Sequence, residues 1–208
     1  MRHEILLNFT PLETRVALVE QGMLQEILIE RATHRGLVGN VYLGKVARVL
    51  PGMQACFVDI GLDRSAFLHA KDLPTDNNDR DRSIQQLVTE GQDLLVQVIK
   101  DPVGSKGARL TAEVSLPARH LVLMPFATHV GISQRIEDEG TREHLKAIAQ
   151  QALDAQGIGW GVIVRTAGDG HTSEDLEDDL VYLKRVWVNI CAEKKIVKAP
   201  ALLFAELP

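Results

Sequence analysis

Two phenylalanines between residues 39 and 69 are candidates for an exposed aromatic surface on which flat rings, such as nucleic-acid bases, could stack. The run GNVYLGKVARVLPGMQACFVDIGLDRSAFLH reads as short strands separated by glycine-containing turns. Successive side chains of a strand point to opposite faces, so Phe57 is expected outside if Cys56 and Val58 fill the interior. Phe67 alternates with its neighbours in the same way. Stacking of a base on an aromatic ring contributes on the order of 1–3 kcal/mol and tolerates any base sequence.

Two lysines are candidates for charge beside these rings. Lys45 lies on the opening strand of the run, and Lys106 lies in the loop GSKG further along the chain. The alternative is that Phe57 and Phe67 are both core residues, because most phenylalanines in proteins are buried. The period of two argues against this alternative but leaves it open.

A second candidate site is the pair Arg165-Thr166. Arg165 ends the apolar strand WGVIV and is followed by Gly168-Asp169-Gly170 and a helix start at Thr172. A guanidinium can hold phosphate oxygens through two parallel hydrogen bonds. A hydroxyl and exposed backbone N–H groups would complete an anion pocket. The alternative is an ion pair of Arg165 with an acid such as Asp169, and the pattern by itself favours that alternative.

No catalytic or metal-binding constellation is predicted within these residues. The sequence has no Walker A loop, no GxSxG and no HxxxH or HExxH spacing. The strand ILLNF carries Asn8 where a two-metal nuclease would need a carboxylate. The acidic run from Glu174 to Asp179 follows a helix start, so it is interpreted as a solvated face that complements the helix dipole.

The elements that position these residues fall into three segments. Residues 1 to about 35 contain three strands, the last two joined by a hairpin turn at Glu20-Gln21-Gly22, and this small sheet needs a partner. Residues 37–116 contain five short strands and a polar loop, PTDNNDRDRS, which is typical of a small antiparallel barrel. The stretch ARLTAEVSL is predicted as the last of these strands.

The third segment, residues 119–195, is predicted to be a small α/β unit. LVLMPF, GISQRI and WGVIVRTAG are expected strands, and Thr141 to Leu153 is an expected helix. The longest helix is expected from Ser173 to Lys195, with Thr172 and Asp175 forming a capping box. Its apolar stripe has spacings of three and four residues and consists of Leu176, Leu180, Leu183, Trp187 and Ile190. The final run, PALLFAELP, begins a new element and stops, which suggests a fragment.

Composition restricts the function further. Hydrophobic residues make up 45% of the 208 residues, and the formal net charge is -5, which argues against a general polyanion binder. Any contact with nucleic acid must therefore come from a local basic patch. No apolar run is long enough to span a membrane, and the start lacks the features of a secretory signal. Cys56 and Cys191 form no CxxC pair, so a reduced, cytoplasmic protein is expected.

The chain closely resembles the N-terminal half of the bacterial ribonuclease E/G family over essentially all of its length. The resemblance is carried by residues 39–69, by ILLNFTPLETRVALVEQG before them and by KDPVGSKGARLT after them. LPGMQACFVDIG is a long and specific match. The sequence is more similar to the ribonuclease G members of the family than to the ribonuclease E members.

The resemblance implies an α+β fold in several parts. Residues 1–35 would be the opening strands of an incomplete, structural RNase H-like subdomain. Residues 37–116 would be the inserted S1 domain, an OB-fold barrel of five strands, and residues 119–195 would be the 5′-sensor. Residues 196–208 would begin the return to the RNase H-like subdomain.

The resemblance also implies roles for individual residues. Phe57, Phe67 and Lys106 match positions of the family that contact RNA. Arg165 and Thr166 match its phosphate-sensing pair, and Val122 matches a further sensor contact. Ala118 replaces a glycine of the ribonuclease E pocket, which puts that backbone contact in doubt.

The family's catalytic magnesium site and its zinc link between subunits lie further along the chain than these residues. We therefore expect an RNA-binding, 5′-monophosphate-sensing portion of a single-strand endoribonuclease that is inactive without its missing catalytic subdomain. One alternative is a self-contained, non-catalytic RNA-binding or regulatory protein. A second alternative is that some metal-dependent cleavage resides in this chain.

Overall fold

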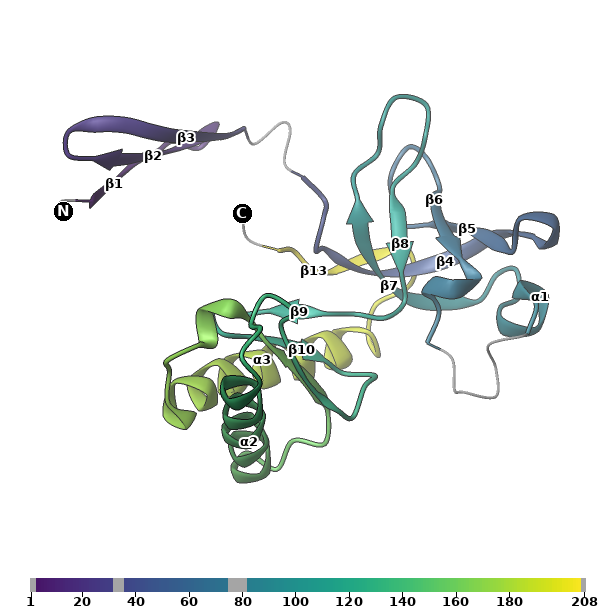
Figure 1. Cartoon of the computed structure of the whole chain (residues 1–208). Helices are drawn as coiled ribbons and strands as arrows, with labels where there is room; N and C mark the ends of the chain where they lie inside the picture. Colours follow the sequence, from purple (N-terminus) through teal and green to yellow (C-terminus); the bar gives the residue numbers. More distant parts are fainter. Residues whose placement is uncertain (1–2, 32–35, 75–81, 207–208) are drawn as a thin grey trace. The chain divides into compact units, whose positions relative to one another are not determined.

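The computed structural model of the chain describes residues 3–31, 36–74 and 82–206. The chain divides into two compact units, the first ending at Leu37 and the second spanning Val38–Glu206 (Figure 1). Most of the polar loop PTDNNDRDRS lies outside the described residues. In the described part of the chain, no helix combines the length and the apolarity that crossing a membrane requires.

The first unit is an antiparallel sheet of three strands, β1 (His3–Phe9), β2 (Glu13–Glu20) and β3 (Met23–Arg31), in the order β1-β2-β3. The predicted hairpin turn is confirmed: Gln21 and Gly22 have φ values of 50° and 81°, which suit the tight turns that match strand twist. Leu6 and Leu7 alternate between the two faces and are 57% and 70% exposed, so the sheet by itself buries neither face.

The second unit begins with a closed barrel of five strands. These are β4 (Val41–Leu50), β5 (Ala55–Asp59), β6 (Ala66–His69), β7 (Asp93–Lys100) and β8 (Arg109–Thr111). They lie in the order β4-β5-β6-β8-β7, and an additional pairing of β4 with β7 closes the barrel. All neighbours are antiparallel except β6 and β8, which are parallel, so the predicted all-antiparallel barrel is corrected at this one pair.

Short helical turns complete the barrel. They are η2 (Pro51–Met53), η3 (Ala70–Asp72) and α1 (Ile84–Leu87). The interior is apolar, and its fully buried side chains include Val46, Val58, Leu68, Val96, Val98 and Leu110. Burial of this apolar interior contributes the main part of the free energy that stabilises the closed barrel.

A second sheet follows, with the order β11-β12-β10-β9. Its strands are β9 (Leu116–Pro117), β10 (Leu121–Met124), β11 (Val130–Ile132) and β12 (Gly161–Val164). The prediction of one strand over ARLTAEVSL is wrong, because β8 ends at Thr111 and Leu116–Pro117 pairs with β10. Directly after β8, the Ala112 N–H donates to the carbonyl of Asp72 at 2.7 Å and no longer pairs with β7.

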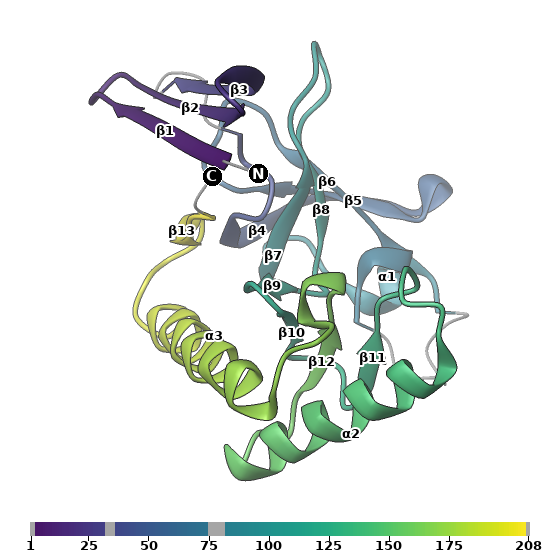
Figure 2. The same cartoon turned by 60° about the vertical axis from the view of Figure 1, so that its left-hand side comes forward.

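Two long helices pack on this sheet, α2 (Glu139–Ala155) and α3 (Ser173–Glu193) (Figure 2). The predicted capping box of Thr172 and Asp175 is confirmed at the start of α3. Each residue of the predicted stripe of α3 is buried: Leu176, Leu180, Leu183, Trp187 and Ile190. The alternate buried residues of the strands face the same cluster: Leu121, Leu123, Val162 and Val164.

The last strand, β13 (Ala201–Phe204), pairs antiparallel with the first residues of β4. Val41 and Leu43 of β4 belong to the same buried cluster as the α/β sheet, so the second unit has one continuous core at this point. The return of residues 196–208 to an RNase H-like subdomain stays a prediction, as does the four-part division of the chain.

Candidate nucleic-acid interface

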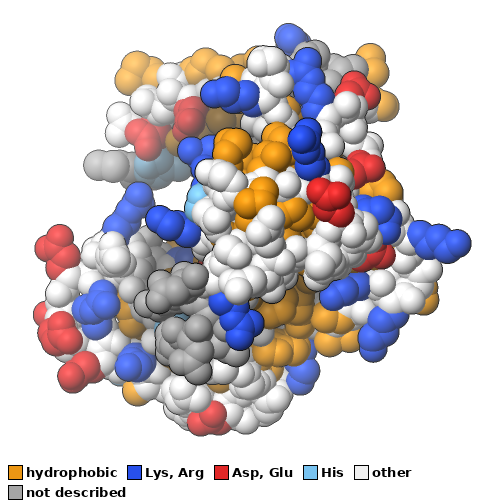
Figure 3. Space-filling model, turned by 90° about the vertical axis from the view of Figure 1, so that its right-hand side faces the viewer, with side chains coloured by type: hydrophobic (Ala, Val, Ile, Leu, Met, Phe, Trp, Pro, Cys, Tyr) orange, Lys and Arg blue, Asp and Glu red, His pale blue; other side chains and the backbone are white. Residues whose placement is uncertain are grey.

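The formal net charge is -5, so a contact with nucleic acid needs basic side chains that are gathered on one part of the surface. Figure 3 shows one face of the molecule on which Lys and Arg side chains lie among hydrophobic ones. Single-stranded nucleic acid is bound by aromatic rings, on which bases stack, next to cations, which pair with phosphates, so the aromatic residues near these cations decide whether such a site exists.

Phe57 and Phe67 are cross-strand partners on β5 and β6. Their ring centroids are 6.1 Å apart, with an edge-to-face angle of 72°. Cys56 and Val58 are fully buried, whereas both phenylalanines are only half-buried, so the alternation predicted from the sequence is observed. Burial raises the pKa of the Cys56 thiol to about 11, which agrees with its place inside the barrel. The interpretation of both phenylalanines as core residues is therefore not supported.

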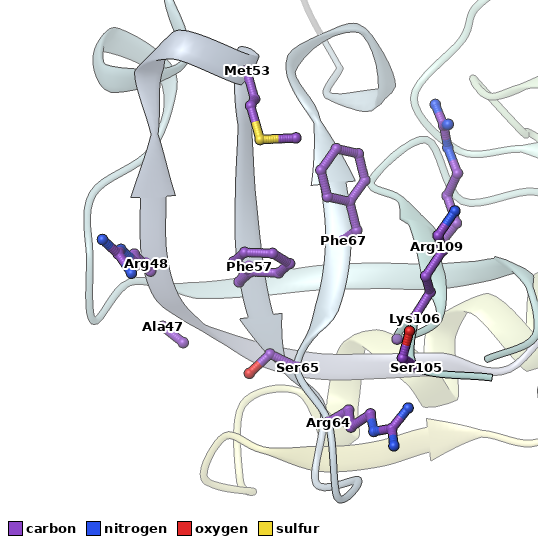
Figure 4. A pocket seen from close by; sticks show the side chains of 11 residues that line it. Ala47, Arg48, Met53, Phe57, Arg64, Ser65, Phe67, Ser105, Lys106 and Arg109 are labelled. Atoms are coloured by element: carbon purple, nitrogen blue, oxygen red, sulfur yellow. The ribbon is translucent and has the colours of Figure 1, made fainter. Parts of the chain in front are cut away.

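These two rings line a surface cavity of about 870 Å³ (Figure 4). The other lining residues are Ala47, Arg48, Met53, Arg64, Ser65, Ser105, Lys106, Gly107 and Arg109. Four of them are basic, and no acidic side chain is found among the described residues that line the cavity. The cavity therefore combines an apolar stacking surface with an excess of positive charge.

Lys106 is brought to this cavity by a short hairpin. The Lys106 and Val103 backbones exchange two hydrogen bonds of 3.0 and 3.2 Å across its tip. The Arg64 guanidinium donates to the carbonyl of Gly104 and so ties the tip to the loop before β6. At Gly107 a Cβ atom would lie only 2.1 Å from the carbonyl oxygen of Ser65, so only glycine permits this approach.

Arg48 and Arg109 line the cavity but were not predicted from the sequence. Arg48 lies opposite Phe57, where an irregularity in β4 shifts the register after Val46. Arg109 lies beside Phe67, because β8 runs parallel to β6. Neither the bulge nor the parallel pairing has a local signal in the sequence, so strand alternation could not place these arginines.

Lys45 is not brought to the cavity. Its ammonium lies 2.5 Å from the Asp93 carboxylate and 3.4 Å from the carbonyl oxygen of Gly91. On β4 it lies opposite Asp59 rather than opposite Phe57. Three of the four predicted RNA-binding residues therefore share one cavity, and Lys45 lies apart from them.

Arg165 directly follows β12, and its contacts differ from the ion pair considered above. Its backbone N–H donates to the carbonyl of His120 at 2.8 Å, which extends the pairing with β10. Its guanidinium donates from Nη1 to the carbonyl of Ala118 at 2.6 Å, and the residue is exposed. A single backbone contact of this kind orients the guanidinium and leaves its other donors available to an anion.

Thr166 directly follows this arginine in the chain, and Val122 lies on the neighbouring strand β10. Thr166 is exposed and begins the short turn η4 (Thr166–Gly168). Val122 is half-buried and pairs with Ile163, which lies two residues before Arg165. Because side chains two residues apart lie on the same face of a strand, Val122 and Arg165 project from the sheet face opposite the helices. The backbone N–H of Ala118 donates to the carbonyl of Leu121 at 2.7 Å, so that group is already used within the protein.

One acidic residue near the start of α3, Asp179, holds the beginning of β10. Asp179 is half-buried, and its Oδ2 accepts hydrogen bonds from the N–H groups of His120 (2.6 Å) and Leu121 (3.1 Å). Asp179 is thus an exception to the predicted solvated face. The hydrogen bonds from the backbone and side chain of Thr172, followed by the contact with His171, hold the pKa of Asp175 below its ordinary value.

The fold and the cavity together define a class of protein, an RNA-binding β-barrel joined to an α/β unit. Residues 37–114 match the S1 RNA binding domain, and residues 115–208 match the Ribonuclease E/G family. The chain belongs to the ribonuclease E/G family, and the resemblance predicted from the sequence is confirmed.

Similar proteins agree with this assignment. The chain is 53% identical over 216 residues to Ribonuclease G of Salmonella typhimurium (strain SL1344), which covers 100% of this chain and 44% of that protein. It is 52% identical over 216 residues to Ribonuclease G of Escherichia coli (strain K12), covering 100% of this chain and 44% of that protein. It is 38% identical over 210 residues to Ribonuclease E of the same strain, covering 97% of this chain and 20% of that protein. The chain thus spans less than half the length of these relatives, and they favour a portion of a ribonuclease over a self-contained regulatory protein.

Proposed function

We propose that this chain is the RNA-binding and 5′-monophosphate-sensing N-terminal portion of a ribonuclease G-like endoribonuclease. Its substrate would be single-stranded RNA, and its role would lie in cytoplasmic RNA processing and decay, including that of ribosomal RNA. The observation that carries the proposal is the cavity in which Phe57 and Phe67 adjoin four basic side chains.

The barrel would bind the strand without reading its base sequence. Bases would stack on Phe57 and Phe67, because any base offers a flat face to an aromatic ring. Lys106, held at the rim by its hairpin, would pair with the phosphate backbone. Lys45 would contribute less than Lys106, since its ammonium is already paired with Asp93.

The α/β unit would read the 5′ end. Arg165 has its backbone fixed by His120 and its guanidinium oriented by the carbonyl of Ala118. From this position it would donate to a terminal phosphate, with the Thr166 hydroxyl adding a hydrogen bond and Val122 packing against the terminal nucleotide. A 5′-hydroxyl end offers no comparable charge, so the preference between ends would come from this site.

Cleavage is assigned to residues beyond those described. Among the described residues, no three His, Cys, Asp or Glu side chains are grouped so that they would hold a metal ion. Within the described residues we therefore propose no site for the catalytic magnesium or the subunit-linking zinc that the family implies. We accordingly propose that the chain binds RNA and requires the rest of its protein in order to cut it.

The test is a binding measurement by fluorescence anisotropy with one RNA sequence in three forms. These are a single strand with a 5′-monophosphate, the same strand with a 5′-hydroxyl, and a duplex. The expected order of affinity is monophosphate, then hydroxyl, then duplex, because a paired base cannot stack on the phenylalanines. Equal affinity for all three forms would contradict the proposal.

A parallel incubation tests the inactivity of the chain. The purified chain is mixed with magnesium and 5′-monophosphorylated RNA, and the products are separated on a denaturing gel. The RNA is expected to stay intact. Cleavage that persists after stringent purification and copurifies with the chain would show that catalytic residues lie within it.

A further inference from the structure

Arg109 lines the cavity that contains Phe57 and Phe67, and it forms an ion pair with Asp72. On the basis of the proposed RNA binding at the barrel, we infer that these two residues form a positioning pair for the Phe67 ring. Arg109 then acts by holding an aromatic side chain in its stacking orientation. It does not act as a further contact to phosphate.

The geometry around Phe67 supports this role. The Arg109 guanidinium carbon lies 6.0 Å from the centroid of the Phe67 ring, within the range of a cation–π contact. The edge-to-face contact with Phe57, at 6.1 Å, restrains the same ring. Phe67 therefore has one aromatic and one cationic neighbour, and loss of either gives its ring more freedom to turn.

Asp72 holds the guanidinium in this place. An Nη2 atom of Arg109 lies 3.0 Å from Oδ2 of Asp72, whose side chain is only 23% exposed. The backbone of Asp72 is fixed as well, because its carbonyl accepts from the Ala112 N–H at 2.7 Å and from the Thr111 hydroxyl at 3.2 Å. The carboxylate thus comes from a segment tied to the strand that carries Arg109.

The ion pair with Asp72 gives Arg109 a different role from that of Lys106. A cation already paired with a carboxylate gives up part of that pairing when it turns to a phosphate, and the carboxylate itself repels the strand. Arg64 likewise donates a hydrogen bond to the carbonyl of Gly104. If Arg109 served only as a phosphate contact, the carboxylate beside it would oppose its function. A role in orienting the ring uses both charges.

The test is the sign of the change caused by Asp72→Asn, which keeps the size and the backbone contacts and removes the charge. On Coulombic grounds alone, loss of a negative charge strengthens RNA binding. A positioning role predicts the opposite, about fivefold weaker binding of 5′-hydroxyl single-stranded RNA. Arg109→Gln should weaken binding to a similar degree, with the slope of log K against log salt unchanged.

A double-mutant cycle with Phe67→Ala separates positioning from misfolding. In the Phe67→Ala background, Asp72→Asn should cause no additional loss, whereas misfolding would lower affinity in both backgrounds. Stronger binding by Asp72→Asn would overturn the inference. So would a salt slope reduced by about 0.7 in Arg109→Gln, which is the signature of one lost phosphate contact on a single strand. If Phe67→Ala itself had no effect, the proposed function of the barrel would fail instead.

Discussion

The Phe57–Phe67 face of the barrel is made of side chains from neighbouring strands, whereas the Arg165–Thr166 segment depends on backbone groups at the end of β12. In the barrel, cross-strand pairing puts the two rings 6.1 Å apart. In the α/β unit, the carbonyl groups of Ala118 and His120 set the position of one guanidinium and its backbone.

This difference has a consequence for what each region can recognise. A surface of rings and basic side chains is tolerant, because stacking accepts any base and cations accept any phosphate. A guanidinium oriented by one backbone carbonyl is selective, because its remaining donors point in few directions. Under the proposed function, the barrel would supply affinity along the strand and the Arg165 segment would supply discrimination at its 5′ end. The following changes test that division of labour.

The largest effect is expected for Phe57→Ala. Removal of the ring should weaken binding of single-stranded RNA about tenfold or more, and equally for monophosphate and hydroxyl ends. The matched control is Phe126→Ala, since Phe126 is 51% exposed and packs edge-to-face on Trp187 in the α/β unit. Fluorescence anisotropy measures both variants. An equal loss of RNA affinity in the control would show that the barrel face contributes no more to binding than another exposed aromatic residue.

An effect at the lower end of that range is expected for Arg165→Ala, and only at one kind of RNA end. The affinity for 5′-monophosphate RNA should fall about tenfold, because charge-assisted hydrogen bonds are lost, while that for 5′-hydroxyl RNA stays unchanged. Arg185→Ala, an exposed arginine on α3, controls for the loss of one positive charge. Competition between the two RNA forms provides the measurement. A preference that survives in Arg165→Ala would count against the sensor.

A difference of about threefold is expected between two lysines of the barrel. Lys106→Gln should weaken binding and reduce the salt slope by about 0.7, since one phosphate contact is lost. Lys45→Gln should change both quantities less, because Lys45 is paired with Asp93 outside the cavity. Titrations at several salt concentrations distinguish the two. Equal slopes for both variants would place Lys45 on the RNA path after all.

The smallest effect concerns stability and pH. Thr172→Ala should lower the melting temperature by about 2–4 °C at pH 7, because it removes the cap of α3. The pKa of Asp175 is lowered in the folded chain by the hydrogen bonds of Thr172, so its contribution is present above its ordinary value of 3.8 and is lost as the pH falls through the folded value. The difference between wild type and variant should therefore shrink towards pH 3.

Thermal melts followed by circular dichroism at pH 7, 5 and 3 measure this difference, with Thr128→Ala as the control at an exposed threonine. The variant should also keep its barrel affinity for hydroxyl-ended RNA. A gap in melting temperature that widens on acidification would show that the carboxylate of Asp175 is not the group responsible.

Much of the fold could be predicted because its signals are local. The stripe of α3 and its capping box are properties of consecutive residues, and both are observed. Strand alternation likewise placed Cys56 inside and Phe57 outside. The end of β8 was missed because it depends on a distant partner: pairing with β7 ends at Thr111, and the Ala112 N–H donates instead to the carbonyl of Asp72, 40 residues earlier in the chain.

The amino-acid sequence by itself determined the family and the position of Arg165 at the end of a strand. It also identified Phe57, Phe67 and Lys106 as candidate residues of one site. Only the tertiary structure decided which cations meet the rings. Arg48 and Arg109 reach the cavity through a bulge and a parallel pairing, while Lys45 turns to Asp93. The physical reason is that periodicity fixes the face of a strand on which a side chain lies, whereas its neighbours depend on register and closure of the barrel.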